Sequence, residues 1–117
     1  NPGYQRGFKE LKPSTRQRFI AVSFEYPETK IETEILVKET NVDPVVAKKL
    51  VAIGNKIRNL TELGLTETVS TRLLVDAAKI IHSGLPKPLS VHVAIVEPLT
   101  DDLQTVEALK DLCDLMI

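Results

Sequence analysis

The segment LKPSTRQRF, residues 11–19, carries three cations within seven residues: Lys12, Arg16 and Arg18. The apolar run FIAVSF begins at Phe19, directly after them. A guanidinium held at the start of a buried segment suits a phosphate or carboxylate partner, because its planar fork of N–H donors matches their oxygens. A solvated turn accounts for the same residues without any ligand. Arg16 and Arg18 are therefore candidate anion-binding residues, and both interpretations stay open at this stage.

A second candidate is Arg72, in the segment STRLLVDAAKIIHSG, where Ser70 or Thr71 is expected to cap a helix and Gly84 to end it. A cation in the first turn opposes the helix dipole, at a cost of roughly 0.3 to 1 kcal/mol. The position becomes favourable when an anion lies at the helix start, where free N–H groups and the arginine can share it. The alternative is a surface arginine whose aliphatic stem covers apolar neighbours.

The spacing of histidine and cysteine indicates neither a metal site nor a nucleophilic centre. His82 and His92 lie ten residues apart with no cysteine pattern nearby, so we expect surface or half-buried histidines. Cys113 falls on the apolar stripe of the last expected helix, which favours a small core residue over a nucleophile. No metal ligand is therefore assigned.

Composition limits the classes of function. The chain has 117 residues, of which 43% are apolar and 26% charged, and its formal net charge is −1. This balance gives no overall field to attract nucleic acid, and the 4% of aromatic residues give no base-stacking platform. No apolar run approaches the roughly 18 residues that would span a bilayer, so membrane insertion is not expected. The single cysteine fits a reducing compartment, and we expect a cytoplasmic protein.

One β-strand is expected, over Phe19 to Glu25, because this segment is rich in Phe, Ile and Val and alternates loosely before Pro27. A single strand cannot pair its own backbone groups. The chain also begins at Asn1, within a Pro-Gly turn signal, rather than at methionine. Both features predict a fragment of a longer protein, whose remaining strands lie in sequence not present here.

A bundle of about five helices is expected after this strand. Pro27 lies near the start of the first helix, whose buried face is predicted to contain Ile31, Ile35 and Leu36. The second helix is capped by Asp43, and Gly54 in its interior permits close packing. Its apolar stripe repeats every three or four residues, at Val46, Leu50, Ile53, Ile57 and Leu60.

The last two expected helices follow the one that contains Arg72. The segment KPLSVHVAIVEPL fits either a strand or a helix, and we favour a buried helix because its clear neighbours are helical. The final helix, in TDDLQTVEALKDLCDLMI, is expected to be capped by Thr100 or Asp101. Its buried face is predicted to contain Leu103, Val106, Leu109, Cys113 and Met116. The fold class is thus mainly α, with one orphan strand before a helical bundle.

Four segments resemble one known family in order along nearly the whole chain. They are NPGYQ, LKPSTRQRF, STRLLVDAAKIIHSGLP and VAIVEPLTDD. Together they are similar to the C-terminal portion of the CbbQ/NirQ/NorQ family, in the MoxR branch of the AAA+ ATPases. The resemblance implies that residues 1–26 are the end of a nucleotide-binding core. Residues 27–117 would be a helical lid domain with the C-terminal extension of this family.

The resemblance also implies roles for four residues. Asn1 matches the polar sensor-one residue that helps to position the attacking water. Arg18, in the pair RF, matches the arginine finger that a subunit supplies to its neighbour, and Arg16 is a second finger candidate. Arg72 matches the sensor-two arginine of the lid, which contacts nucleotide phosphates. Arg18, Arg16 and Asn1 would thus be catalytic, and Arg72 would bind the cofactor.

A complete family member would bind ATP and Mg2+ and work as a homo-oligomeric, hexameric ring. By resemblance, it would act as a chaperone or activase on a client enzyme, such as nitric oxide reductase or rubisco, with a partner bearing a von Willebrand factor A-like domain. This sequence contains no G-x-x-x-x-G-K-[ST] loop. We therefore expect no cofactor and no ATP hydrolysis by this chain alone. The alternative function is a non-enzymatic helical adaptor that binds protein partners.

Overall fold

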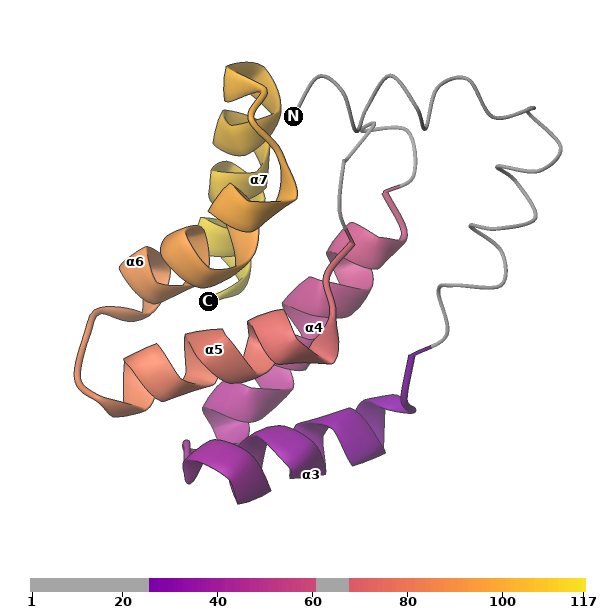
Figure 1. The fold of residues 1–117 in the computed structure, drawn as a ribbon, viewed down its shortest axis with the longest axis vertical. Coiled ribbons are helices and arrows are strands. Elements are labelled where there is room, and N and C mark those ends of the chain that lie inside the picture. The colour runs from indigo at the N-terminus through magenta and orange to yellow at the C-terminus, as the bar shows by residue number, and fades with distance from the viewer. Residues whose placement is uncertain (1–25, 61–67) are drawn as a thin grey trace, which may run out of the picture.

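The computed structural model describes residues 26–60 and 68–117, and this part of the chain is helical (Figure 1). Its α-helices are α3 (Thr29–Thr40), α4 (Pro44–Arg58), α5 (Thr71–His82), α6 (Lys87–Val91) and α7 (Leu103–Met116). Within these ranges the five helices confirm the mainly α prediction, and no strand is present. The expected strand, Phe19 to Glu25, lies outside the described residues, as does nearly all of the expected core segment 1–26.

Helix α3 ends where Asn41 adopts a left-handed conformation, with φ 61°, and donates its backbone N–H to the carbonyl of Val37 at 2.8 Å. The predicted buried face is correct for Leu36, which is fully buried. It is wrong for Ile31, which remains 46% exposed. Glu32 takes the buried position instead, because it is one helical turn before Leu36 and has a cationic partner on α4.

Helix α4 begins as predicted. The carboxylate of Asp43 accepts a hydrogen bond from the backbone N–H of Val45 at 2.8 Å, and Pro44 occupies the first helical position. The buried face contains the predicted Val46, Leu50, Ile53 and Ile57. Gly54 lies against α5: a Cβ atom at this position would be 3.1 Å from Leu74 Cδ1. The predicted close packing at this glycine is confirmed.

Helix α5 is capped by Ser70, whose hydroxyl accepts from the backbone N–H of Leu73, and Gly84 with φ 110° follows its end. Both predictions for this helix are confirmed. The ambiguous segment that follows is helical, as we favoured. It runs through α6 into a π-helical turn, η2 (His92–Val96), and a 3-10 turn, η3 (Glu97–Leu99).

The cap of α7 is Asp102, so the prediction of Thr100 or Asp101 is wrong. The Asp102 carboxylate accepts from both the backbone N–H and the hydroxyl of Thr105. The hydroxyl of Thr100 instead accepts a hydrogen bond from the backbone N–H of Asp102, and α7 begins at Leu103, directly after this turn. Leu103, the first residue of α7, is 79% exposed, so its predicted place on the buried face is wrong, whereas Leu109 and Cys113 are buried as predicted.

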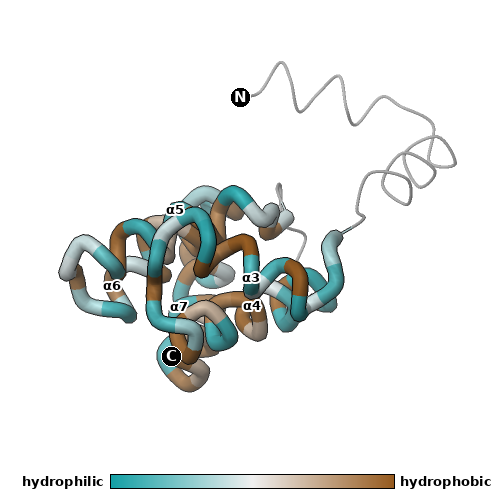
Figure 2. Tube along the Cα trace, turned by 90° about the horizontal axis from the view of Figure 1, so that it is seen from below, coloured by the Kyte–Doolittle hydropathy of each residue, from teal (hydrophilic) through white to brown (hydrophobic). Residues whose placement is uncertain are grey.

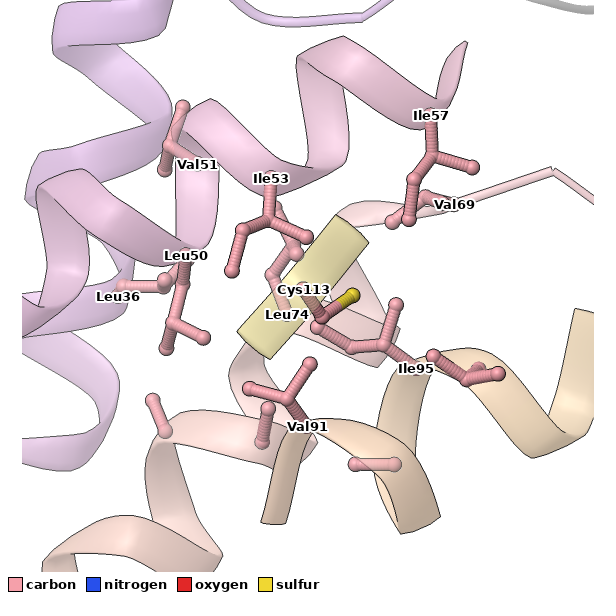
Figure 3. Packing of buried hydrophobic residues seen from close by; sticks show 14 of the residues in the cluster. Leu36, Leu50, Val51, Ile53, Ile57, Val69, Leu74, Val91, Ile95 and Cys113 are labelled. Atoms are coloured by element: carbon pink, nitrogen blue, oxygen red, sulfur yellow. The ribbon is translucent and has the colours of Figure 1, made fainter. Parts of the chain in front are cut away.

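The helices surround one core. Helix α3 packs on α4 and α5, the α6–η2 segment packs on α5, and α7 packs on η2 and α4 (Figure 1). Apolar and polar segments alternate along the helices, as expected for amphipathic helices that share a core (Figure 2). Leu74, Ile95 and Cys113 come from three different elements and belong to the same buried cluster (Figure 3). None of the helices in the described ranges is long and apolar enough to cross a bilayer.

Candidate functional site

The structure places Arg72 as predicted, in the first turn of α5. It is the second residue of that helix, and its side chain is exposed. Among the described residues it has no hydrogen-bond or ion-pair partner. Its charge is therefore not neutralised by any residue that the structure describes. An exposed guanidinium beside the N–H groups of a helix start is chemically suited to contact an anion.

A buried ion pair lies directly behind this first turn. Arg58, at the end of α4, donates from Nη2 to Glu32 Oε2 at 2.7 Å and from Nη1 to Glu32 Oε1 at 2.9 Å. The Glu32 side chain is fully buried, and the Arg58 side chain exposes 5% of its surface. The two-bond geometry is the strong, directional form of an arginine–carboxylate contact.

The same pair holds the chain that leads into α5. Thr71, the residue before Arg72, donates its hydroxyl to Glu32 Oε2 at 2.7 Å. Arg58 Nε donates to the backbone carbonyl of Val69 at 2.8 Å. Glu32 and Arg58 thus bind two points of the α5 entry, one in the backbone and one in a side chain. We call the three side chains of Glu32, Arg58 and Thr71 the Glu32 clamp.

Aromatic and polar neighbours complete the surroundings of Arg58. The Tyr26 ring stacks on the guanidinium, with 3.8 Å between Cζ and the ring centroid. The Tyr26 hydroxyl shares a hydrogen bond with the hydroxyl of Thr68. Asn55 accepts from Arg58 Nη1 at 3.0 Å and donates to the hydroxyl of Thr29 at 3.1 Å. The start of the described chain and the entry to α5 are therefore joined through Arg58.

The electrostatics of Glu32 favour its ionised form. Burial acts to raise the pKa of this carboxyl, but hydrogen bonds from Arg58 and Thr71 and the charge of Arg58 outweigh it. The net result is a pKa of Glu32 below its ordinary value. The Glu32–Arg58 pair is therefore formally neutral and does not offset the positive charge of Arg72, which is exposed at this end of α5.

His82, His92 and Cys113 do not form a metal site or a nucleophilic centre with other described residues. His82 is exposed, and His92 is half-buried, with Nε2 2.8 Å from Asp114 Oδ1. Cys113 is fully buried; burial, with a smaller effect from the Asp114 charge, raises the pKa of its thiol to about 11. Over residues 26–60 and 68–117, no three His, Cys, Asp or Glu side chains gather as a metal site would require.

Asn1, Arg16 and Arg18, the other predicted site residues, lie outside the described residues. The Glu32 clamp, in contrast, was not predicted from the sequence. Its one local signal is spacing: Glu32, Leu36 and Thr40 recur every four residues and all three are buried. A charged residue in register with a core leucine indicates a buried partner, although it does not identify Arg58.

The family is decided by comparison with known proteins. The family model described as CbbQ/NirQ/NorQ C-terminal matches residues 32–116. The chain belongs to the CbbQ/NirQ/NorQ family. The resemblance found in the sequence motifs is thereby confirmed, and the matched region contains all of α4, α5, α6 and α7 together with the Glu32 clamp.

Individual members of this family are similar over most of the chain. Denitrification regulatory protein NirQ of Pseudomonas aeruginosa is 47% identical over the whole chain, which covers 45% of that protein. Protein NorQ of Paracoccus denitrificans is 46% identical over 96% of the chain, covering 42% of NorQ. Protein CbbQ of Hydrogenophilus thermoluteolus is 46% identical over 87% of the chain, covering 38% of CbbQ. The chain thus spans less than half the length of the curated relatives it matches.

Proposed function

We propose that this chain is the C-terminal part of an AAA+ ATPase that couples ATP hydrolysis to the maturation or activation of a client enzyme. Family membership supports a regulatory or chaperone role. NirQ is named a denitrification regulatory protein, and BssE of Thauera aromatica, 30% identical over 87% of the chain, has a name that proposes a chaperone role. The single structural observation that carries the proposal is Arg72, an exposed cation without a described partner at the start of α5.

Arg72 fits the chemistry of a bound triphosphate. Phosphoryl transfer is catalysed mainly by positioning and by charge placed against the phosphates. A guanidinium at a helix start adds its own positive charge to that of the helix dipole, so a phosphate there relieves a local repulsion. In the proposed function, Arg72 contacts the phosphates bound by its own subunit from the lid. No described side-chain cluster is assigned to Mg2+.

The proposed catalytic arginines come from a neighbouring subunit. Arg18 is the arginine finger, Arg16 the second finger candidate, and Asn1 the sensor-one residue that orients the attacking water. A finger supplied in trans is worth about 10³ to 10⁵ in rate where it has been measured. One nucleotide would then touch the core and lid of one subunit and the finger of the next in a homo-oligomeric ring. Hydrolysis would change those contacts and thereby the angle of the lid.

The whole protein is proposed to bind ATP and Mg2+ through a phosphate-binding loop, a motif that this sequence does not contain. This chain by itself is therefore expected to show no ATP hydrolysis. A von Willebrand factor A-like partner and a metalloenzyme or rubisco-type client complete the proposed assembly, and its proposed location is the cytoplasm.

The test is the ATPase rate of the full-length protein carrying single substitutions. Arg72→Ala should raise the KM for ATP, because a phosphate contact is lost, and Arg18→Ala should lower kcat by about 10³-fold or more. Lys79→Ala removes an exposed cation from the last turn of the same helix and should leave both constants unchanged. Wild-type rates in both arginine variants would reject the ATPase roles assigned to them.

A non-enzymatic adaptor is the second candidate, and one observation favours it. Leu85, Leu89 and Val93 lie four residues apart, and each is about 45% exposed. Leu85 precedes α6, Leu89 lies in α6 and Val93 in η2, so exposed apolar side chains recur along this segment, which suits contact with a protein partner. The adaptor hypothesis predicts that Arg16, Arg18 and Arg72 can each be replaced by alanine without loss of function, so the same variants separate the two proposals.

A further inference from the structure

The Glu32 clamp is costly to build for stability alone. Two charges must leave water, and replacing a buried ion pair by apolar side chains of similar volume is often neutral or even stabilising. Unlike apolar side chains, the ion pair forms directional hydrogen bonds, which fix the orientation of the groups that it contacts. Arg58 and Glu32 hold each other through two hydrogen bonds, and each also bonds the entry to α5: Arg58 Nε donates to the Val69 carbonyl, and Glu32 Oε2 accepts from the Thr71 hydroxyl.

The clamp fixes the rotation of the first turn of α5. Two bonds reach this segment from different donors and acceptors: Thr71 to Glu32 at 2.7 Å, and Arg58 to the Val69 carbonyl at 2.8 Å. Turning or sliding the start of α5 would break both. Successive residues on a helix are about 100° apart, so anchoring Thr71 inward directs its neighbour Arg72 outward, where the structure finds it exposed.

We infer that Glu32, Arg58 and Thr71 are positioning residues that set the direction of Arg72 toward the nucleotide phosphates. This inference rests on the proposed function of Arg72. The clamp touches no phosphate itself and acts only through the backbone of residues 69–72. A charged group displaced by about 1 Å can cost about 10²-fold in rate, so a few hydrogen bonds that fix its direction have a large effect.

Thr71 offers the cleanest test, because its hydroxyl can be removed with little change of shape. In the full-length protein, Thr71→Val deletes the bond to Glu32, whereas Thr71→Ser retains a hydroxyl donor. We expect Thr71→Val to raise the KM for ATP by about fivefold or more and Thr71→Ser to stay within twofold of wild type. Thr33→Val is the matched control, because the Thr33 hydroxyl bonds only the Thr29 carbonyl of its own helix.

A double-variant cycle shows whether the effect of Thr71→Val on the KM for ATP depends on Arg72. In an Arg72→Ala background, Thr71→Val should cause no further change in KM, because the group that it misdirects is gone. An undiminished effect in that background would overturn the inference, since it would show general loosening of the lid. Amide exchange of Leu73 and Leu74, measured without nucleotide, should be faster in Thr71→Val than in Thr33→Val; equal protection would also overturn it.

The outcomes separate this inference from the function on which it rests. If Arg72→Ala raises the KM while Thr71→Val does not, the clamp has no positioning role and the proposed contact of Arg72 stands. If Arg72→Ala leaves the KM unchanged, the phosphate contact itself is wrong, and the positioning role is rejected with it.

Discussion

Glu32 and Arg58 are 26 residues apart in the chain and meet through two hydrogen bonds of 2.7 and 2.9 Å inside the bundle. This pair takes the place of an apolar contact between the first turn of α3 and the last turn of α4. Because both side chains are almost fully removed from water, each depends on the other for its hydrogen bonds. A single substitution at either residue is therefore expected to lower the free energy of unfolding far more than a matched substitution of both.

Replacing Glu32 by leucine should lower the free energy of unfolding by about 3 to 5 kcal/mol, because the buried Arg58 charge loses its partner. Urea unfolding followed by circular dichroism measures this loss. Glu34→Leu is the control: Glu34 lies on the same helix but is exposed, so its replacement should change stability by less than about 0.5 kcal/mol.

The double variant Glu32→Leu with Arg58→Met should recover most of the lost stability, because neither charge is then left unpaired. If the double variant loses about as much as the sum of the two single variants, the two residues are energetically independent and this account of the pair is wrong.

The stability of the bundle should depend on pH through Glu32. Hydrogen bonds from Arg58 and Thr71 lower the pKa of Glu32 in the folded state, despite the opposing effect of burial. A lowered folded pKa gives a stability contribution that is fully present above the unfolded pKa, about 4.3 for Glu, and is lost as pH falls through the folded value. Glu32→Gln cannot titrate, so it lacks this contribution at every pH.

The measurement is the difference in unfolding free energy between wild type and Glu32→Gln. This difference should be constant between about pH 6 and 7 and should shrink below about pH 4, where the carboxyl of Glu32 in the unfolded chain becomes protonated before that of the folded protein. Subtracting the variant removes the effect of the other carboxylates, which titrate in both proteins. A difference that grows with falling pH would mean that the folded pKa of Glu32 is raised rather than lowered.

The sequence predicted those features that depend on neighbours within one or two helical turns. Asp43 and Ser70 cap their helices as expected because the carboxylate or hydroxyl bonds a backbone N–H two or three residues ahead. The cap of α7 was misplaced because Thr100, Asp101 and Asp102 are all good caps. The choice among them depends on a turn in which the Thr100 hydroxyl binds the backbone N–H of Asp102.

The clamp could not be predicted because it depends on tertiary contacts. Periodicity assigned Ile31 to the core by its apolar type, whereas Glu32 is in register with Leu36 and is stabilised by Arg58 from another helix. Local sequence places Arg72 at a helix start, and that placement is confirmed. It contains no information on which distant side chains set the direction of that start.

Gly54 gives a prediction about packing between α4 and α5. A Cβ atom there would lie 3.1 and 3.3 Å from the two δ carbons of Leu74, which is fully buried. Alanine is better than glycine in a helix by about 1 kcal/mol, but the forced shift of a buried leucine costs about 1 to 3 kcal/mol. Gly54→Ala should therefore lower the free energy of unfolding by about 1 kcal/mol, measured by urea unfolding.

Two further variants separate the packing cost from helix propensity. Ala52→Gly, at an exposed position of α4, should cost about 1 kcal/mol by propensity alone. In a Leu74→Ala background the space beside Gly54 is open, so Gly54→Ala should there become neutral or stabilising, because only the propensity gain remains. If Gly54→Ala stabilises the wild-type protein as much as the Leu74→Ala protein, Leu74 moves freely and the close approach of α4 to α5 does not depend on the glycine.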